Sequence, residues 1–140
     1  METSFTLEVI TPESIVYTGR VKELILPAID GQIGVLANHA PLVTALAVGA
    51  LQIKEEDGSE RTMVVSDGFF EIANNHARVL ADAGERAEDI DLSRAQAAEK
   101  RARKRLEEGE NREIDFDRVR AVRSLQKALW RERVARKRGR

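Results

Sequence analysis

The sequence predicts an α+β protein in two parts: an N-terminal antiparallel β-sandwich over residues 1–84 and a C-terminal antiparallel two-helix hairpin over residues 85–140. All three Pro and seven of the nine Gly lie at or before residue 84, where they separate short apolar runs. The balance of charge changes at the same place. Residues 1–84 hold 5 basic and 12 acidic side chains, whereas residues 85–140 hold 18 basic and 12 acidic side chains. We therefore expect a boundary between Gly84 and Asp91, within a length that suits one domain or two small ones.

In the first part, alternation of polar and apolar residues predicts short strands. Phe5, Leu7 and Val9 fall on one face of the first run, 4–9, and further runs cover 14–17, 21–26, 51–54, 61–66, 69–73 and 77–80. Asp57-Gly58 predicts a hairpin loop, and Asn74-Asn75 tolerates the positive φ of a tight turn. Gly31–Gly34 lacks the Gly-Lys-Ser/Thr ending of a phosphate loop, so we interpret it as a turn between strands. Many short strands are typical of a β-sandwich or barrel.

In the second part, apolar and small residues recur every three to four positions, which predicts helices over 92–108 and 116–138. We expect Asp91 to cap the first helix, Gly109 to end it, and Asp115 to cap the second. The apolar face of the first helix is rich in Ala, so it buries little area per residue. We expect the hairpin to be marginally stable alone and able to leave its resting place.

Composition excludes several kinds of site. The chain has no Cys, and its two histidines, His39 and His76, are 37 positions apart, so neither a disulfide framework nor a Cys-based metal site nor a catalytic triad is expected. Residues 31–53 carry no formal charge, but Gly, Pro and polar residues interrupt them too often for a membrane span. The first run begins at Ser4, so we expect no targeting segment. No nucleophile, base and stabiliser can be named together, so an independent enzyme is disfavoured.

Two features of the second part point to binding. Residues 118–140 hold ten Lys or Arg and one acid, Glu132, a charge that attracts nucleic acid, acidic headgroups or an acidic protein surface. A solvated helix face with a frayed end over 134–140 is the alternative. At the junction, Asp91 and Arg94 lie three apart: a carboxylate that can accept hydrogen bonds from a base or ribose, and a guanidinium that can pair with phosphate. An N-cap with a local ion pair explains the same spacing.

Three segments resemble the epsilon subunit of F-type ATP synthase: GQIGVLANHAPLVTAL at 31–46, SDGFFEI at 66–72 and AGERAEDIDLSRAQAA at 83–98. The resemblance covers essentially the whole chain and implies a ten-stranded sandwich followed by two helices. It implies a non-catalytic rotor subunit of the central stalk, which couples proton transport through the c ring to ATP synthesis. It also implies that the C-terminal helices inhibit ATP hydrolysis.

The same resemblance implies the partners and the place of the protein. The sandwich is expected to bind the gamma subunit and the c-subunit ring, and the second helix to reach the alpha and beta catalytic subunits in the inhibited state. No cofactor is required, and the membrane is met only through the complex. The protein would be peripheral, on the cytoplasmic face of the bacterial plasma membrane or an equivalent organelle membrane.

Residue by residue, the resemblance assigns three groups. Gln32, Asn38 and His39 face the c ring. Ile90, Asp91, Arg94 and Ala95 match an Ile/Leu-Asp-x-x-Arg-Ala motif that binds ATP, with or without Mg²⁺, as a regulatory ligand, and Glu85 and Arg101 fall at two further contacts, with Arg123 and Lys127 beside the aligned positions of the second helix. The inhibitory basic helix presents Arg118, Arg120, Arg123, Lys127, Arg131 and Arg133.

Two other interpretations remain. A nucleic-acid-binding protein would use the basic helix, and its affinity would fall steeply with salt. That interpretation leaves the first part of the chain unexplained, so we expect no nucleic-acid partner. A free-standing nucleotide sensor would function without gamma.

Overall fold

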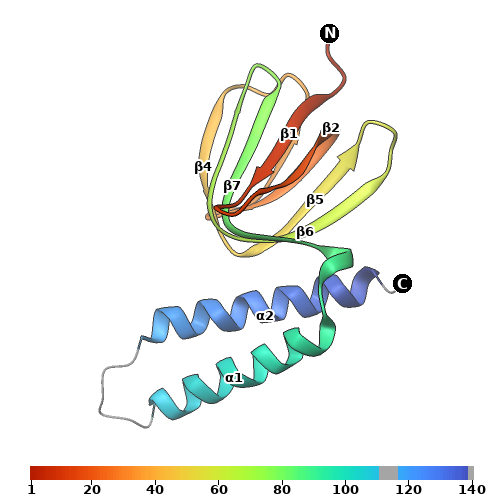
Figure 1. Cartoon of the computed structure of the whole chain (residues 1–140). Coiled ribbons are helices and arrows are strands. Elements are labelled where there is room, and N and C mark those ends of the chain that lie inside the picture. The colour runs from red at the N-terminus through yellow and green to blue at the C-terminus, as the bar shows by residue number, and fades with distance from the viewer. Residues whose placement is uncertain (111–116, 139–140) are drawn as a thin grey trace.

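The computed structural model describes residues 1–110 and 117–138, and its elements follow the predicted order of strands and then helices. They are β1 (Phe5–Ile10), β2 (Ile15–Ala28), β3 (Gly31–Leu36), β4 (Leu42–Leu46), β5 (Gly49–Glu55), β6 (Glu60–Ala73), β7 (His76–Arg86), the 3₁₀ turn η1 (Ala87–Asp89), α1 (Leu92–Glu110) and α2 (Arg118–Arg138). The sandwich stands above a hairpin that lies across its lower end (Figure 1). The predicted α+β fold class, a β-sandwich followed by two helices, is confirmed.

The strands form one strongly bent sheet of order β1-β7-β6-β4-β2-β3, with β5 paired to both β2 and β6. β1 also pairs with β2, so the sheet closes on itself. The β1–β7 pairing is parallel, and the remaining pairings are antiparallel. The enclosed core consists of fully buried large side chains, among them Phe5, Leu7, Leu24, Leu26, Leu51 and Phe70.

The described residues form seven strands, fewer than the ten that the resemblance implies, because two long strands bend and pair with several neighbours: β2 with four strands and β6 with three. β2 pairs with β1 over residues 15–21 and with β3 over 23–28. β6 pairs with β5 over 60–65 and with β4 over 68–72, bending at Asp67 (φ 48°) and Gly68 (φ 127°). A Cβ at Gly68 would lie 1.9 Å from the Leu80 carbonyl oxygen, so only Gly fits there.

Turn predictions are partly confirmed. Asn74 and Asn75 have φ of 51° and 60° in the β6–β7 turn, and Gly58 has φ of 91° in the β5–β6 loop, as expected. The interpretation of Gly31–Gly34 as a turn is wrong. Gly31 begins β3 opposite Ala28, so the turn lies one step earlier, at residues 29–30. The sequence of β3 does not alternate clearly between polar and apolar residues, because only Val35 of this strand is fully buried.

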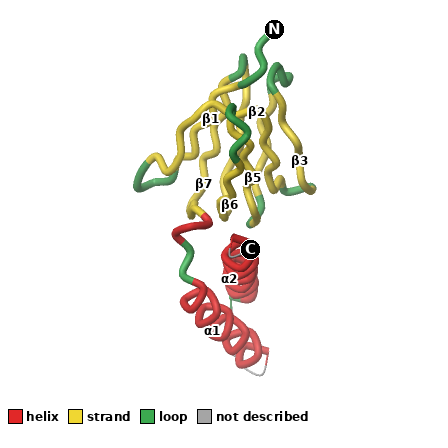
Figure 2. The backbone as a smooth tube through the Cα atoms, turned by 90° about the vertical axis from the view of Figure 1, so that its right-hand side faces the viewer, coloured by secondary structure: helices red, strands yellow, loops and turns green. Residues whose placement is uncertain are grey.

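The hairpin lies against the sandwich through α2, with α1 on the far side of α2 (Figure 2). Asp91 caps α1 as predicted, because its Oδ1 accepts a hydrogen bond from the Arg94 amide at 3.1 Å. Gly109 does not end α1, which continues to Glu110; one Gly lowers helix stability by only about 1 kcal/mol relative to Ala. α2 begins at Arg118, two residues later than predicted, and Asp117 caps it through the Arg120 amide at 2.9 Å. The predicted cap Asp115 lies outside the described residues.

Candidate functional site

The junction between β7 and η1 fixes where the hairpin begins. The Arg86 guanidinium, at the end of β7, donates two hydrogen bonds to the Val16 carbonyl oxygen, at 2.7 and 3.1 Å. Four residues later, Ile90 is 1% exposed and belongs to a small apolar cluster between sandwich and hairpin. That cluster contains Ala50, Val64, Ala87, Ile90, Val134 and Ala135, with Leu92 and Trp130 packed against it.

Trp130 is the large aromatic side chain that α2 brings to the sandwich. A Cβ built on Gly49 would lie 3.8 Å from its indole ring and 2.7 Å from the Pro27 Cβ, so the missing side chain at Gly49 leaves room for close packing. The Arg133 guanidinium lies 4.5 Å from the centre of the Trp130 ring in a cation–π contact. The docking of the hairpin therefore depends on few large side chains.

The residues predicted to bind ATP divide into buried and accessible groups. Ile90 and Ala95 are 1% and 0% exposed, so their side chains pack rather than line an open site. Asp91 is the N-cap of α1, and its second oxygen lies 4.0 Å from the Arg94 Nε. Glu85 pairs with Arg131 of α2 through two hydrogen bonds, at 2.7 and 3.3 Å. The carboxylates of the motif are thus already engaged by this chain.

A cleft of about 270 Å³ opens between α1 and α2. It is lined by Ala98, Arg101, Ala102, Arg105, Ser124, Lys127, Ala128 and Arg131. Residues spaced by three, four and seven positions share a helix face, which explains how each helix contributes its set. Four cationic side chains and no carboxylate line this cleft, an arrangement suited to a phosphate-rich anion.

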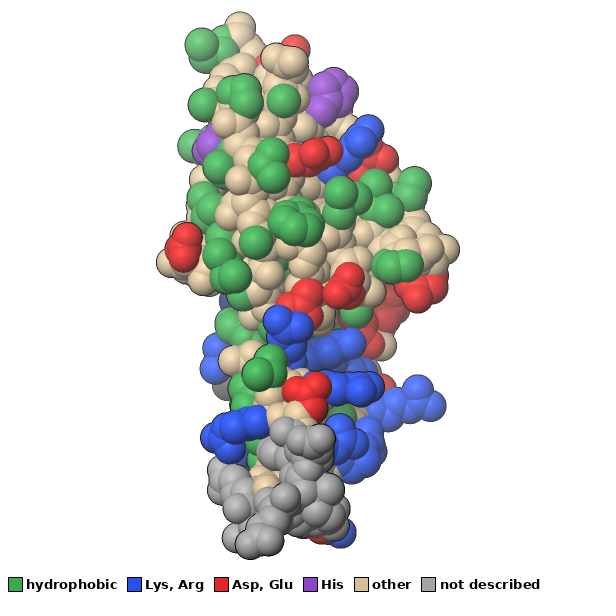
Figure 3. Space-filling model, turned by 90° about the vertical axis from the view of Figure 1, so that its left-hand side faces the viewer, with side chains coloured by type: hydrophobic (Ala, Val, Ile, Leu, Met, Phe, Trp, Pro, Cys, Tyr) green, Lys and Arg blue, Asp and Glu red, His purple; other side chains and the backbone are tan. Residues whose placement is uncertain are grey.

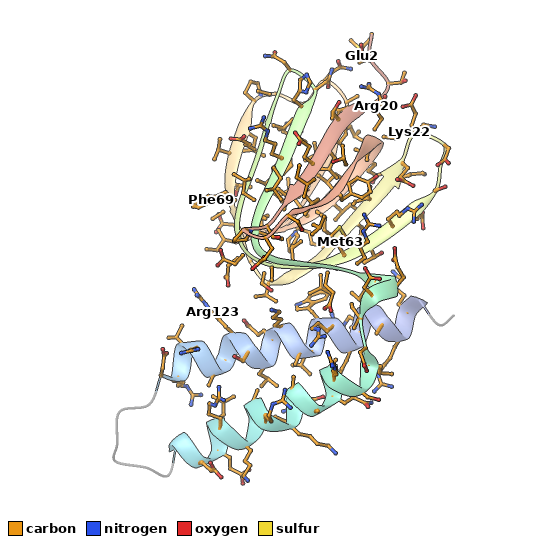
Figure 4. All side chains as sticks on the ribbon, in the orientation of Figure 1. Glu2, Arg20, Lys22, Met63, Phe69 and Arg123 are labelled. Carbon is orange, nitrogen blue, oxygen red and sulfur yellow. The ribbon has the colours of Figure 1, made fainter. Side chains whose placement is uncertain are left out.

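The cleft unites two of the predicted ATP contacts, Arg101 and Lys127, but not Arg123. Arg123 lies on the side of α2 that faces the sandwich, away from α1 (Figure 4). Arg94 lies one turn before Ala98 on the same face of α1, and its side chain is 84% exposed, so it extends the cationic row of the cleft.

The predicted basic set of α2 does not form one surface. Arg131 is held by Glu85 and its side chain is only 18% exposed, while Arg133 covers Trp130. Arg118, Arg120 and Arg123 are exposed near the start of α2. On the face shown in the space-filling view, Lys and Arg side chains gather over the hairpin, whereas hydrophobic side chains gather over the sandwich (Figure 3).

The predicted c-ring residues lie at opposite ends of β3. Gln32 lies within β3, opposite Pro27, rather than in a loop. Asn38 and His39 follow the other end, where the Asn38 amide group donates to the Glu2 carbonyl oxygen at 2.8 Å. The Asn38 backbone N–H also donates to the Asn75 side chain at 2.6 Å, which ties the β3–β4 turn to the β6–β7 turn.

An exposed apolar face on β4, β6 and β7 was not predicted. Val43, Phe69 and Leu80 are 70%, 57% and 42% exposed, and Phe69 is the direct neighbour of Leu80 in the sheet. Phe69 projects outward from the sandwich (Figure 4). A groove of about 520 Å³ lies beside it and contains Val43 and Glu71. Apolar patches of this kind mark protein interaction sites.

Comparison with known families accounts for both parts of the chain. Residues 4–87 match the model of the ATP synthase delta/epsilon chain beta-sandwich domain, and residues 88–136 match that of the long alpha-helix domain of the same chain. The chain belongs to this family.

Named relatives agree with this assignment. The ATP synthase epsilon chain of Syntrophomonas wolfei is 42% identical over 136 residues, which cover 97% of each chain. That of Latilactobacillus sakei is 38% identical and covers 89% of this chain and 87% of its own length. A chain of the Euglena gracilis mitochondrial ATP synthase OSCP/F1/c-ring structure has the same fold, with a TM-score of 0.79 at 21% identity over 92% of this chain and 79% of that chain. A chain from the Tetrahymena thermophila mitochondrial ATP synthase central stalk/c-ring structure also has this fold, with a TM-score of 0.59 at 13% identity. The match covers 96% of each of the two chains.

As an epsilon-family chain, the protein is a non-catalytic subunit of ATP synthase, as the sequence predicted. Within residues 1–110 and 117–138, no helix is long and apolar enough to cross a membrane. The same residues contain no group of three or more potential metal ligands.

The sequence did not reveal two features of the candidate sites, the full lining of the cleft and the exposed apolar face. Arg105 was not singled out, and Arg131 was assigned only to the basic helix, because the pairing register of two helices is not visible in a sequence. The seven-residue spacing of Ala98 and Arg105 places them on one helix face and is the signal that was available. The exposed face around Phe69 was not predicted because the sequence does not show which of the neighbouring residues Phe69 and Phe70 points into the core.

Proposed function

We propose that this chain is the rotor epsilon subunit that couples proton flow through the c ring to ATP synthesis, and that its hairpin restrains ATP hydrolysis. The observation that carries the regulatory part is the way the hairpin docks. α2 makes most of the helical contact with the sandwich, through the small cluster around Trp130 against which Leu92 of α1 also packs. Arg118, Arg120 and Arg123 stay exposed. A hairpin held in this way can detach without unfolding the sandwich.

The sandwich provides the fixed attachment to the rotor. The gamma subunit would cover the apolar face of Val43, Phe69 and Leu80, because burying these side chains removes exposed apolar area from water. The c ring would meet Gln32, Asn38 and His39, of which Asn38 is held rigidly by its bonds to Glu2 and Asn75. Through these partners the protein would be peripheral to the membrane, on its cytoplasmic face.

The released hairpin would act on the catalytic head. Its basic side chains would be attracted to acidic segments of the alpha and beta subunits, with an orientation and salt dependence set by charge. The apolar side chains that leave the sandwich, Trp130 and Val134 among them, would supply contact area.

Removing residues 116–140 from the assembled enzyme tests the inhibitory role. We expect ATP hydrolysis to rise several-fold while the complex keeps its subunit composition, because the sandwich attachment is intact. Removing only residues 139–140 is the matched control and should leave hydrolysis unchanged. Unchanged hydrolysis in a fully assembled complex that lacks residues 116–140 would contradict the proposal.

The cleft between α1 and α2 is the proposed place for ATP, with or without Mg²⁺, as a regulatory ligand. Arg101, Arg105 and Lys127 would face the phosphates, and Arg94 would extend this row. A ligand that binds only the packed hairpin stabilises it by about 2.7 kcal/mol at a hundredfold excess over Kd. ATP would therefore favour the packed state.

Calorimetry on the full-length chain can test this cleft. Arg101→Ala and Arg94→Ala should each lower ATP affinity, Arg101→Ala by about tenfold, because a charge-assisted contact is lost. Lys104→Ala is the matched control: Lys104 is on α1, pairs with Glu108 at 3.8 Å, and does not line the cleft. Equal ATP affinity in Arg101→Ala and Lys104→Ala would place ATP elsewhere.

A further inference from the structure

Among residues 1–110 and 117–138, a single ion pair joins the sandwich to the helices. The Arg131 guanidinium of α2 donates from Nε to Glu85 Oε1 at 2.7 Å and from Nη2 to Glu85 Oε2 at 3.3 Å. Glu85 belongs to the end of β7, so the pair ties α2 directly to the sheet. The side chains of Arg131 and Glu85 are only 18% and 32% exposed, so salt screens this contact less than it screens a surface pair.

The pair lies beside the apolar contact through which α2 docks. Val134 and Ala135, three and four residues after Arg131, share its side of α2 and belong to the small apolar cluster between sandwich and hairpin. Two parallel bonds between a planar guanidinium and a carboxylate fix direction as well as distance. The pair therefore helps to set the orientation in which α2 meets the end of β7.

The basic side chains of α2 differ in how available they are to a partner. Three arginines near the start of α2 are exposed, as described above. Nearer the end of the helix, Arg131 is held by Glu85, and Arg133 lies over the Trp130 ring. The packed hairpin therefore offers only part of its basic charge to an acidic surface, and release from the sandwich would add these two side chains.

We propose that Glu85 is an internal competitor for the acidic surface that the released hairpin meets. In the packed state its carboxylate occupies Arg131, which becomes available only when α2 leaves the sandwich; this inference rests on the inhibitory function proposed above. A bidentate carboxylate uses the Nε–Nη2 edge of a guanidinium, and a second carboxylate cannot use the same edge at the same time. Binding of that edge by β7 and by an acidic partner is therefore mutually exclusive.

Hydrogen exchange of the full-length chain tests the internal contact by itself. Glu85→Gln should raise the opening of α2 roughly ten- to hundredfold, because hydrogen bonds to a charged group are lost, while sandwich amides keep their protection. Glu88→Gln is the matched control: it neutralises an exposed acid of η1 at the same junction and should leave α2 unchanged. Equal exchange of α2 in the two variants would overturn the inference.

Charge reversal separates attraction from shape. Glu85→Arg should loosen α2 more than Glu85→Gln does, because it places two cations side by side. Combining Glu85→Arg with Arg131→Glu brings opposite charges together again, so the double variant should regain much of the lost protection. Exchange of α2 in the double variant as fast as in Glu85→Arg alone would also overturn the inference.

ATP hydrolysis by the assembled enzyme tests the competition. Glu85→Gln should lower hydrolysis below that of the unaltered complex, because more hairpin is released with Arg131 intact. Arg131→Gln also loosens α2, but it removes the side chain that an acidic partner would bind, so hydrolysis should stay above that of Glu85→Gln.

The complex that lacks residues 116–140 is the reference for this comparison. Equal hydrolysis in Glu85→Gln and Arg131→Gln would overturn the competition, while a rise in hydrolysis on removal of residues 116–140 would still support the inhibitory function. No change on that removal would contradict both the inhibitory function and the competition.

Discussion

The interior of the sandwich and the interface of the hairpin are built from different side chains. The sandwich encloses Phe5, Leu7, Leu24 and Phe70 with no exposed surface, whereas the most buried positions between the helices are alanines such as Ala95 and Ala102. Burying a large apolar side chain contributes roughly 1.5–3 kcal/mol, and a single methyl group contributes about 0.8. Apolar burial therefore fixes the sandwich, while the interface between the helices buries less apolar area per residue, as the proposed release of the hairpin requires.

The contacts that join the two regions likewise involve few large side chains. Trp130 and Val134 are the larger side chains that α2 places against the sandwich, and the Glu85–Arg131 pair lies beside them. A subunit that attaches rigidly at one end and switches at the other needs this asymmetry, because release of the hairpin must not cost the fold of the sandwich.

The strongest test of the comparison truncates neighbouring aromatic residues of β6. Phe70→Ala should lower the free energy of unfolding by about 3–5 kcal/mol, because it empties a fully buried site. Phe69→Ala is the matched control: its side chain is 57% exposed, so the change should stay within about 0.5 kcal/mol. Urea unfolding followed by circular dichroism gives both values, and equal losses would contradict the assigned strand phase.

A second test removes the docking side chain of α2. Trp130→Ala should weaken docking by roughly 1–3 kcal/mol, because a half-buried aromatic contact is lost. Hydrogen exchange of α2 should then accelerate about tenfold or more, while sandwich amides keep their protection. Leu129→Ala, at an exposed neighbouring position, is the control and should leave exchange unchanged. Faster exchange throughout the sandwich would show that the two regions are not separable.

The sequence predicts most of the sandwich wherever local chemistry is decisive. Asn74-Asn75 forms its turn because these residues tolerate positive φ, and Asp91 caps α1 because its side chain reaches a free backbone N–H. Predictions failed where tertiary context decides. The sequence predicted a break between strands at Asp67-Gly68, but these residues form a bend inside β6. The Leu80 carbonyl oxygen lies so close to the bend that only Gly fits at position 68.

The site was less predictable than the fold, because it depends on how helices pair. Arg101 and Lys127 were assigned to one ligand, but that they line one cleft with Arg105 and Arg131 follows only from the packing of α1 on α2. The pairing of Glu85 with Arg131 is equally invisible in the sequence, where the two residues are 46 positions apart. The resemblance named candidate residues, and the geometry shows which of them lie together.

The smallest expected effect concerns a polar contact of the sandwich that depends on pH. The Tyr17 hydroxyl donates to Glu55 at 2.6 Å, and this bond and one from Arg61 lower the pKa of Glu55. Its stabilisation is present above the ordinary value of 4.5 and is lost as pH falls through the lowered value. The sandwich should therefore lose this contribution to its stability at acidic pH.

Tyr17→Phe isolates this sandwich contact. At pH 7 it should lower the free energy of unfolding by about 0.5–1.5 kcal/mol, because one hydrogen bond is lost from a buried tyrosine. It should also flatten the loss of stability between pH 5 and pH 3 in urea unfolding, since Glu55 then titrates nearer its ordinary value. Hydrogen exchange of α1 should remain as in the unaltered chain, because the altered contact between Tyr17 and Glu55 lies within the sandwich. If Tyr17→Phe altered α1 exchange as strongly as sandwich stability, one cooperative unit would replace the two regions argued above.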